Sequence, residues 1–271
     1  MRFFDNHTHS QFSPDSATSM SELAAQAIAV GAKGISFTDH LDLEAPRNTD
    51  KFVFDVKKQQ RELECVAEKY RDKLQILRGI EVGLQPCAIK STKEYTSPHD
   101  FDVVVASIHF VDGLDPYYGD YYLEKDYKTA YGRVLELIYE TATEYKDFDI
   151  VGHFDYVARY APYKVRDIMY KDFPDELDVL LKFLAENGKA LEINTKTYGD
   201  QRGHIQKLDV SVLKRFKEFG GEAISLGSDS HDAHRVCDKF PYFWEVVKSC
   251  GFNNLVYFEN RRPVFYNPER F

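Results

Sequence analysis

The sequence predicts an α/β protein whose parallel strands close into a barrel covered by helices. Short apolar runs rich in β-branched residues alternate with segments of helical periodicity, and a polar side chain lies at the end of each apolar run. The chain has 271 residues, 43% of them hydrophobic, which is enough to bury one large core. We therefore expect a single domain that spans residues 1–271.

Seven apolar runs have the length and composition of buried strands. Strands joined by helices run parallel, either in a closed barrel or in an open doubly wound sheet. An open sheet gathers its ligands at one switch point, whereas here all seven strand ends carry a candidate polar group, which favours the closed barrel. The predicted strands are Arg2–Asn6, Gly34–Thr38, Gln75–Glu81, Phe101–Ser107, Asp149–Gly152, Lys189–Asn194 and Glu222–Gly227.

Helical segments between the strands have recognisable ends. Ser19 and Glu22 are spaced as a capping box, and Gly31 ends the helix that they begin. A second helix begins at Pro174 and ends before Gly188. Helical periodicity also predicts helices over Phe54–Tyr70, Leu123–Tyr145 and Val210–Phe216.

The composition argues against several classes of protein. A formal net charge of -9, from 44 acidic and 35 basic residues, gives no basic face for nucleic acid. The four cysteines have no CxxC spacing and predict free, buried thiols in a reducing compartment. We find neither a secretory signal nor an apolar run as long as a membrane span. We expect a cytoplasmic protein without membrane association, and no obligate protein partner is evident.

Histidines and acidic residues gather at the predicted strand ends. His7 and His9 are two residues apart, so on an extended strand they point the same way, and Asp229 and His231 repeat this spacing. Six imidazoles with three carboxylates suit zinc, iron or manganese, and they exceed the needs of one ion. We predict two to three divalent ions, held by His7, His9, Asp15, His40, Glu81, His109, His153, Asp229 and His231.

Each member of this set has a structural alternative. A single histidine at a strand end is more often a buried core residue than a ligand, so the prediction depends on the whole set. Asp15 follows Pro14 and is alternatively a turn residue. Asp39 and Asp155 each adjoin or closely follow a candidate histidine, and we expect them to support ligands or form turns.

Six motifs run in order from His7 to His231: HTHS, FTDH, GIE, SIHF, GHFD and SDSH. They resemble the motifs of the polymerase and histidinol phosphatase (PHP) family of metal phosphoesterases. Within that family, HxHxxxSxDS at His7–Ser16 and SIHFVDG at Ser107–Gly113 are similar to the monofunctional histidinol-phosphatases. The resemblance implies a distorted (β/α)7 barrel, TIM-barrel-like, with a trinuclear centre.

The resemblance also implies how the ligands divide among three metals. The first metal would take His7, His9, Glu81 and Asp229, and Glu81 would bridge to a second with His109 and His153. The third would take Asp15, His40 and His231. Other family members place a histidine where this chain has Asp15, so its third site is richer in oxygen.

Clustered divalent ions suit the hydrolysis of a phosphate monoester, because they neutralise the dianion and lower the pKa of bound water from ~15.7 towards ~7. We expect a metal-bridging hydroxide to attack phosphorus, with Glu81, Asp229 and His231 as the catalytic residues. Cationic side chains should bind the outer phosphoryl oxygens. The candidates are Arg159, Arg202 and Lys196, each of which is alternatively a surface ion-pair partner.

Three long loops, His40–Lys51, Phe110–Tyr122 and Thr195–Lys207, are expected to form the rim of a cleft. The second loop offers carboxylates and aromatic rings that suit a cationic amine and an imidazole, although most of its tyrosines are expected to pack against the barrel. The residues concerned are Asp112, Asp115, Tyr117, Tyr118, Tyr121 and Tyr122.

The family resemblance implies hydrolysis of a small phosphorylated substrate, L-histidinol phosphate, to L-histidinol and phosphate in histidine biosynthesis. One alternative is a PHP-type phosphoesterase that acts on nucleotides or nucleic-acid ends. The acidic charge argues against a long nucleic-acid track, but a mononucleotide would not need one. A more remote alternative is a non-catalytic, metal-stabilised binding module. Such a module would usually have lost ligands, and here all nine positions are filled.

Overall fold

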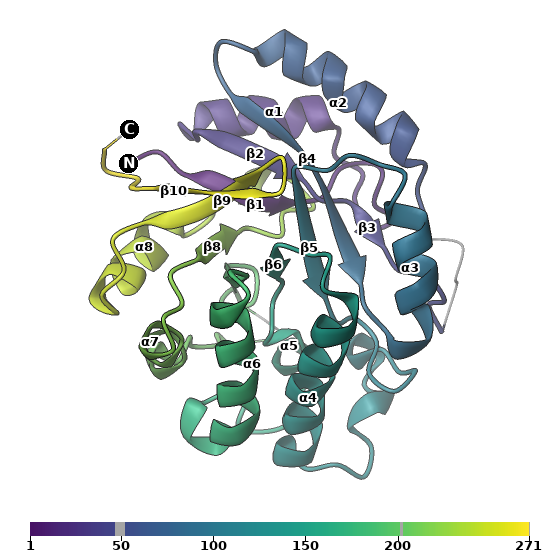
Figure 1. Ribbon diagram of the computed structural model, residues 1–271, viewed down its shortest axis with the longest axis vertical. Coiled ribbons are helices and arrows are strands. Elements are labelled where there is room, and N and C mark those ends of the chain that lie inside the picture. The colour runs from purple at the N-terminus through teal and green to yellow at the C-terminus, as the bar shows by residue number, and fades with distance from the viewer. Residues whose placement is uncertain (47–51, 201–202, 271) are drawn as a thin grey trace.

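Parallel strands form a barrel in the computed structural model, which describes residues 1–46, 52–200 and 203–270 (Figure 1). The strand order is β1-β2-β4-β5-β6-β7-β8, and every neighbouring pair is parallel. The seven predicted strands are confirmed, with shifted ends. Their bounds are β1 Phe4–Thr8, β2 Gly34–Phe37, β4 Gln75–Gly83, β5 Val103–Ser107, β6 Ile150–Val151, β7 Ala190–Asn194 and β8 Ile224–Gly227.

The barrel closes where β1 meets the segment after β8. The His7 carbonyl accepts from the Asp229 amide (2.8 Å), and the His9 amide donates to the Ser230 carbonyl (2.8 Å). Nearer the N-terminus of β1, the Asn6 side chain donates to the Leu226 carbonyl of β8 (3.3 Å). At this point a side chain joins β1 to β8 in place of a backbone ladder.

Three strands were not predicted. The short β3 (His40–Leu41) pairs with the upper part of β4, placing His40 opposite Glu81. An antiparallel hairpin of β9 (Leu255–Glu259) and β10 (Arg262–Tyr266) lies beside β1 (Figure 1). In it the Tyr257 ring stacks on Phe4, with centroids 4.0 Å apart. A hairpin does not follow the strand–helix alternation used for prediction, and β3 is too short to give a pattern.

Helices surround the barrel (Figure 1). The predicted capping box is present, since Ser19 accepts from the Glu22 amide and Glu22 accepts from the Ser19 amide. The helices are α1 Met20–Ala29, α2 Val56–Tyr70, α3 Ile89–Thr96, α4 Tyr127–Tyr145, α5 Tyr156–Tyr160, α6 Pro174–Glu186, α7 Val210–Glu218 and α8 Phe240–Ser249. Short 3-10 helices are η1 Pro86–Ala88, η2 Pro116–Tyr118, η3 Asp120–Tyr122, η4 Tyr170–Asp172 and η5 Ala233–Arg235.

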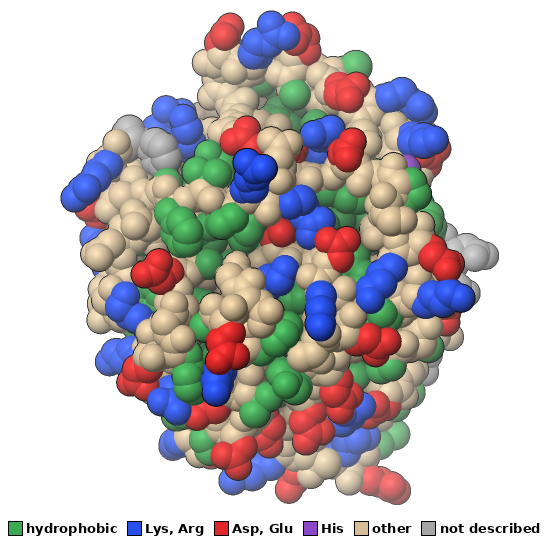
Figure 2. Space-filling view, in the orientation of Figure 1, with side chains coloured by type: hydrophobic (Ala, Val, Ile, Leu, Met, Phe, Trp, Pro, Cys, Tyr) green, Lys and Arg blue, Asp and Glu red, His purple; other side chains and the backbone are tan. Residues whose placement is uncertain are grey.

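Basic and acidic side chains are mixed on the surface of the protein. On the face drawn in Figure 2, basic and acidic side chains are interspersed rather than gathered in one track. Among the described helices, none has the length and apolar character needed to span a bilayer. The cysteines are free, but the predicted burial is wrong for Cys65 and Cys87, which lie exposed on α2 and η1.

Candidate metal centre

The strands deliver the candidate ligands to one end of the barrel. His7 lies on β1 and Glu81 on β4, while His109, His153 and Asp229 each follow the last residue of a strand by two positions. The carboxyl ends of parallel strands open towards the same rim of a barrel. Side chains that are far apart in the sequence therefore meet there.

All nine predicted ligands lie together at this rim. Asp15 Oδ2 is 3.0 Å from His231 Nε2 and 3.7 Å from His40 Nε2, and the Asp15 side chain is 51% exposed. The other eight form overlapping trios with Asp42, in which one ligand atom per residue lies within 4.8 Å of the others. The trios are His9–His40–His231, His7–His9–Asp229, His7–Glu81–His153 and His40–Asp42–His109.

Glu81 is at the centre of the cluster, with no exposed surface. Its carboxylate accepts from the Ser107 hydroxyl (2.6 Å). Burial raises the pKa of this carboxyl, but the neighbouring imidazoles outweigh burial and hold the pKa well below its usual value. Its oxygens lie within 3.5 Å of nitrogens from five imidazoles, those of His7, His9, His40, His109 and His153. A single carboxylate thus contacts most of the candidate ligands.

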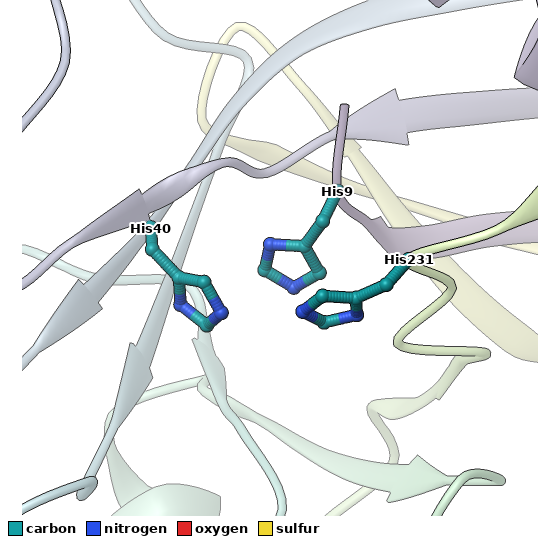
Figure 3. A group of neighbouring side chains, drawn as sticks. All are labelled: His9, His40 and His231. Atoms are coloured by element: carbon teal, nitrogen blue, oxygen red, sulfur yellow. The ribbon is translucent and has the colours of Figure 1, made fainter. Parts of the chain in front are cut away.

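Three histidine rings are stacked at the outer side of the cluster. Figure 3 shows the His9 ring between those of His40 and His231, with centroid separations of 4.1 and 4.2 Å. Burial, together with the charges of His40 and His231, lowers the pKa of His9 well below its usual value. This lowered pKa favours the neutral form of His9, in which an imidazole nitrogen binds a metal.

The residues fit a group of divalent ions. His7 Nε2 and His9 Nε2 are buried and have no hydrogen-bond partner, although buried polar atoms are nearly always paired. Both face Glu81 oxygens, at 3.3 and 3.5 Å. Two atoms bound to one tetrahedral zinc at about 2.1 Å would lie about 3.4 Å apart. Nitrogen-rich ligands with carboxylates match zinc, iron or manganese.

Two buried carboxylates orient the candidate ligand histidines, and neither carboxylate was predicted. Glu192 Oε1 accepts from His7 Nδ1 (2.7 Å), and Glu192 Oε2 accepts from the His153 amide (2.7 Å). Asp42 Oδ1 is 2.8 Å from His109 Nδ1. Burial lowers the pKa of His7, but the charges of Glu192 and Glu81 outweigh burial and raise it well above its usual value. A carboxylate on the second ring nitrogen fixes the orientation of a metal-binding histidine.

The sequence did contain signals for both residues. Glu192 is an acid inside the apolar run ALEIN, where a charge needs a buried partner. Asp42 lies two residues after His40 and so repeats the spacing of His7 and His9. Asp39 is linked to a candidate ligand, since it accepts from the Ser13 hydroxyl (2.8 Å) that contacts His9.

The cationic candidates lie beside Asp229. The buried Arg159 guanidinium donates to Asp229 (3.0 Å), to Asn194 (2.9 Å) and to the Thr197 hydroxyl (2.9 Å). Lys196 Nζ donates to the other Asp229 oxygen (3.1 Å). Although burial raises the pKa of Asp229, Lys196 and Arg159 hold it well below its usual value. Arg202, the third candidate, lies outside the described residues.

A cavity of about 420 Å³ opens above the cluster. Phe110, Asp115 and Lys196 bring two of the predicted rim loops to its wall. Arg159 also lines it, together with Tyr156 and the aromatic side chains Phe52, Tyr117, Tyr118 and Tyr160. The cavity therefore has candidate metal ligands at its floor and a partly aromatic wall.

Known proteins share this chain's sequence and fold. The chain is 31% identical to the histidinol-phosphatase of Lactococcus lactis subsp. lactis, over 97% of this chain and 96% of that protein. It is also 31% identical to a probable histidinol-phosphatase of Clostridium acetobutylicum, with the same coverage. A crystal structure of the Lactococcus lactis histidinol phosphate phosphatase, complexed with zinc, L-histidinol and phosphate, is similar with a TM-score of 0.87 and 30% identity, over 97% of this chain and 99% of that chain.

A model of the PHP domain matches residues 5–196, which include every predicted metal ligand except Asp229 and His231. This match confirms the family that the sequence motifs resemble. Since it covers more than half of the chain, and the relatives cover nearly all of it, the protein belongs to the PHP domain family.

Proposed function

We propose that this protein is a metal-dependent phosphomonoesterase that hydrolyses L-histidinol phosphate to L-histidinol and phosphate. The observation that carries the proposal is the convergence of six histidines and three carboxylates in one cluster, six members of which line a cavity whose wall contains Arg159 and Lys196. The choice of substrate rests on the likeness to histidinol-phosphatases over 97% of the chain.

The nine cluster residues would hold two to three ions of zinc, iron or manganese, divided as the family resemblance implies. When bound, such ions neutralise phosphoryl charge and make water acidic enough to be deprotonated near neutral pH. Glu81, Asp229 and His231 serve catalysis by holding the ions, and the closeness of Glu81 to five imidazoles suits a bridging role. Because the Asp15 side chain is half-exposed, the third metal position, at Asp15, His40 and His231, would be the most accessible to solvent.

Arg159 and Lys196 bind the outer oxygens of the phosphate. Three hydrogen bonds fix the Arg159 guanidinium and use three of its five N–H donors, which leaves two for phosphoryl oxygens. Lys196 adds a charge on the other side of Asp229. Arg202 is proposed as a third contact from the same loop as Lys196. These cations orient the ester and stabilise the charge that grows on it in the transition state.

Replacing Arg159 tests its role in phosphate binding. We expect Arg159→Ala to lower kcat/KM by about 100- to 1,000-fold, the usual cost of removing one donor to a transition-state oxyanion. Metal content, measured by elemental analysis, should stay at the wild-type value. Arg215→Ala, on the outer helix α7, is the matched control and should keep full activity. Lost metal in Arg159→Ala would show instead that this arginine holds the cluster together.

Replacing Glu192 tests the support of His7. Glu192→Gln keeps the shape of the side chain but removes the charge that accepts the His7 proton, so it lowers the basicity of the ligand nitrogen. We expect metal affinity, measured by competition with a chelating dye, to fall about 10- to 100-fold. The exposed Glu186→Gln on α6 should leave affinity unchanged. Equal affinity in both variants would contradict the role given to Glu192.

The activity itself is tested by steady-state kinetics on protein of known metal content. Removing the metals with a chelator should abolish turnover, and adding a divalent metal should restore it. We expect kcat/KM for L-histidinol phosphate to exceed the values for nucleotides, sugar phosphates and a short oligonucleotide. Turnover without metal would contradict the mechanism, and equal kcat/KM for all substrates would contradict the substrate.

A further inference from the structure

Asp155 is a buried acid to which the proposed mechanism gives no role. It lies at the N-cap position of α5, yet its side chain makes no hydrogen bond to the first turn of that helix. An aspartate at an N-cap usually accepts from the backbone there. Because Asp155 is almost completely buried, its carboxylate needs hydrogen-bond partners elsewhere.

The partners of Asp155 are on the segment that follows β7. Its Oδ1 accepts from the Thr197 hydroxyl (3.1 Å), and its Oδ2 accepts from the Tyr198 hydroxyl (2.6 Å). Thr197 and Tyr198 are themselves buried, and the Tyr198 ring packs on Phe243 of α8 with centroids 5.1 Å apart. The carboxylate therefore fastens the segment after β7 to the loop after β6.

The Thr197 hydroxyl lies between this carboxylate and the guanidinium of Arg159, whose Nε donates to it (2.9 Å). A guanidinium can only donate hydrogen bonds, and an ionised carboxylate can only accept them. The single hydroxyl proton therefore points to Asp155, and an oxygen lone pair faces Arg159. Asp155 thus sets the direction of one of the three hydrogen bonds that fix the guanidinium, the others being those to Asp229 and Asn194.

The same segment carries Lys196, the neighbour of Thr197 in the sequence. Lys196 Nζ donates to Asp229 Oδ1 (3.1 Å), and Arg159 donates to Asp229 Oδ2 (3.0 Å). The two cations thus contact the two oxygens of one carboxylate, although they come from different loops. Asp155 joins these loops directly, at the residue next to Lys196.

We propose that Asp155 is a positioning residue for phosphate binding. Through Thr197 and Tyr198 it holds the Arg159 guanidinium and the Lys196 ammonium where they receive phosphoryl oxygens. The inference rests on the proposed function and goes one step beyond it, because it names the group that fixes the two cations. Asp155 is not among the residues that line the cavity, so it acts through its neighbours rather than on the substrate.

The benefit of this arrangement is preorganisation. Ordering a long cationic side chain at the moment of binding costs conformational free energy, which is avoided if the chain is already held in place. Position matters as much as charge, since a displacement of about 1 Å in a group that orients the substrate can lower a rate about 100-fold. Three hydrogen bonds give Arg159 one fixed orientation, and Asp155 secures the one at Nε.

Substitutions of Thr197 test this link, because valine and serine separate its shape from its hydroxyl. We expect Thr197→Val to weaken equilibrium binding of inorganic phosphate to the metal-loaded protein about 10- to 100-fold, as for the loss of a hydrogen bond to a charged group. Thr197→Ser keeps the hydroxyl and should bind phosphate as the wild type does. Thr141→Val on α4 is the matched control, since it removes a buried hydroxyl that donates only to carbonyl groups of its own helix.

Asp155→Asn tests the carboxylate itself. An amide can offer Thr197 either an acceptor or a donor, so the direction of the hydroxyl is no longer fixed. We expect phosphate binding and kcat/KM for L-histidinol phosphate to fall by a similar factor, while metal content stays at the wild-type value. Because the effect passes through Arg159, adding Asp155→Asn to Arg159→Ala should cause a smaller loss than it causes in the wild type.

Four results would overturn the positioning role and leave the proposed function intact: wild-type phosphate binding in Thr197→Val, equal losses in Thr197→Val and Thr197→Ser, lost metal in Asp155→Asn, or an undiminished effect of Asp155→Asn in Arg159→Ala. If the metal-loaded wild type binds phosphate but does not hydrolyse L-histidinol phosphate, the proposed function fails. Phosphate binding by the variants then still decides whether Asp155 positions the cations.

Discussion

The buried carboxylate of Glu81 is the constraint on which the rest of the structure depends. It lies inside a closed barrel with five imidazole nitrogens within 3.5 Å, and burying such a charge is stabilising only if every one of these partners is held in place. The strand register holds these partners in place, because β3 sets His40 opposite Glu81 and the end of β5 supplies the Ser107 hydroxyl. Glu192 and Asp42 then fix the far side of two of the rings.

Closure of the barrel and assembly of the site are the same event. The hydrogen bonds that join the first and last strands come from the backbone of His7, His9 and Asp229, whose side chains belong to the cluster. A chain that had not closed this seam would leave the cluster divided between its two ends. The large separation in sequence between the N-terminal histidines and Asp229 is therefore bridged by the fold itself.

Much of this arrangement could be predicted from the sequence, because parallel strands place their ends at one rim and strand alternation makes His7 and His9 point the same way. The prediction failed where a residue's role depends on its neighbours in space. Glu192 interrupts an apolar run and gives no periodic signal. The contact of Arg159 with Asp229 joins two loops that are distant in the sequence, so no local pattern indicates it. The sequence could not show either that Asp115 lines the cavity whereas Asp112 pairs with Arg133, since packing sets the direction of each side chain.

We propose that these nine side chains hold a small group of divalent ions. Anomalous X-ray diffraction from crystals of the metal-loaded protein, recorded at the absorption edges of zinc, iron and manganese, tests it most directly. We expect two or three peaks at the cluster, each about 2.0–2.3 Å from nitrogen or oxygen atoms of the named residues. A single peak, peaks elsewhere on the molecule, or no peak in fully loaded protein would contradict it.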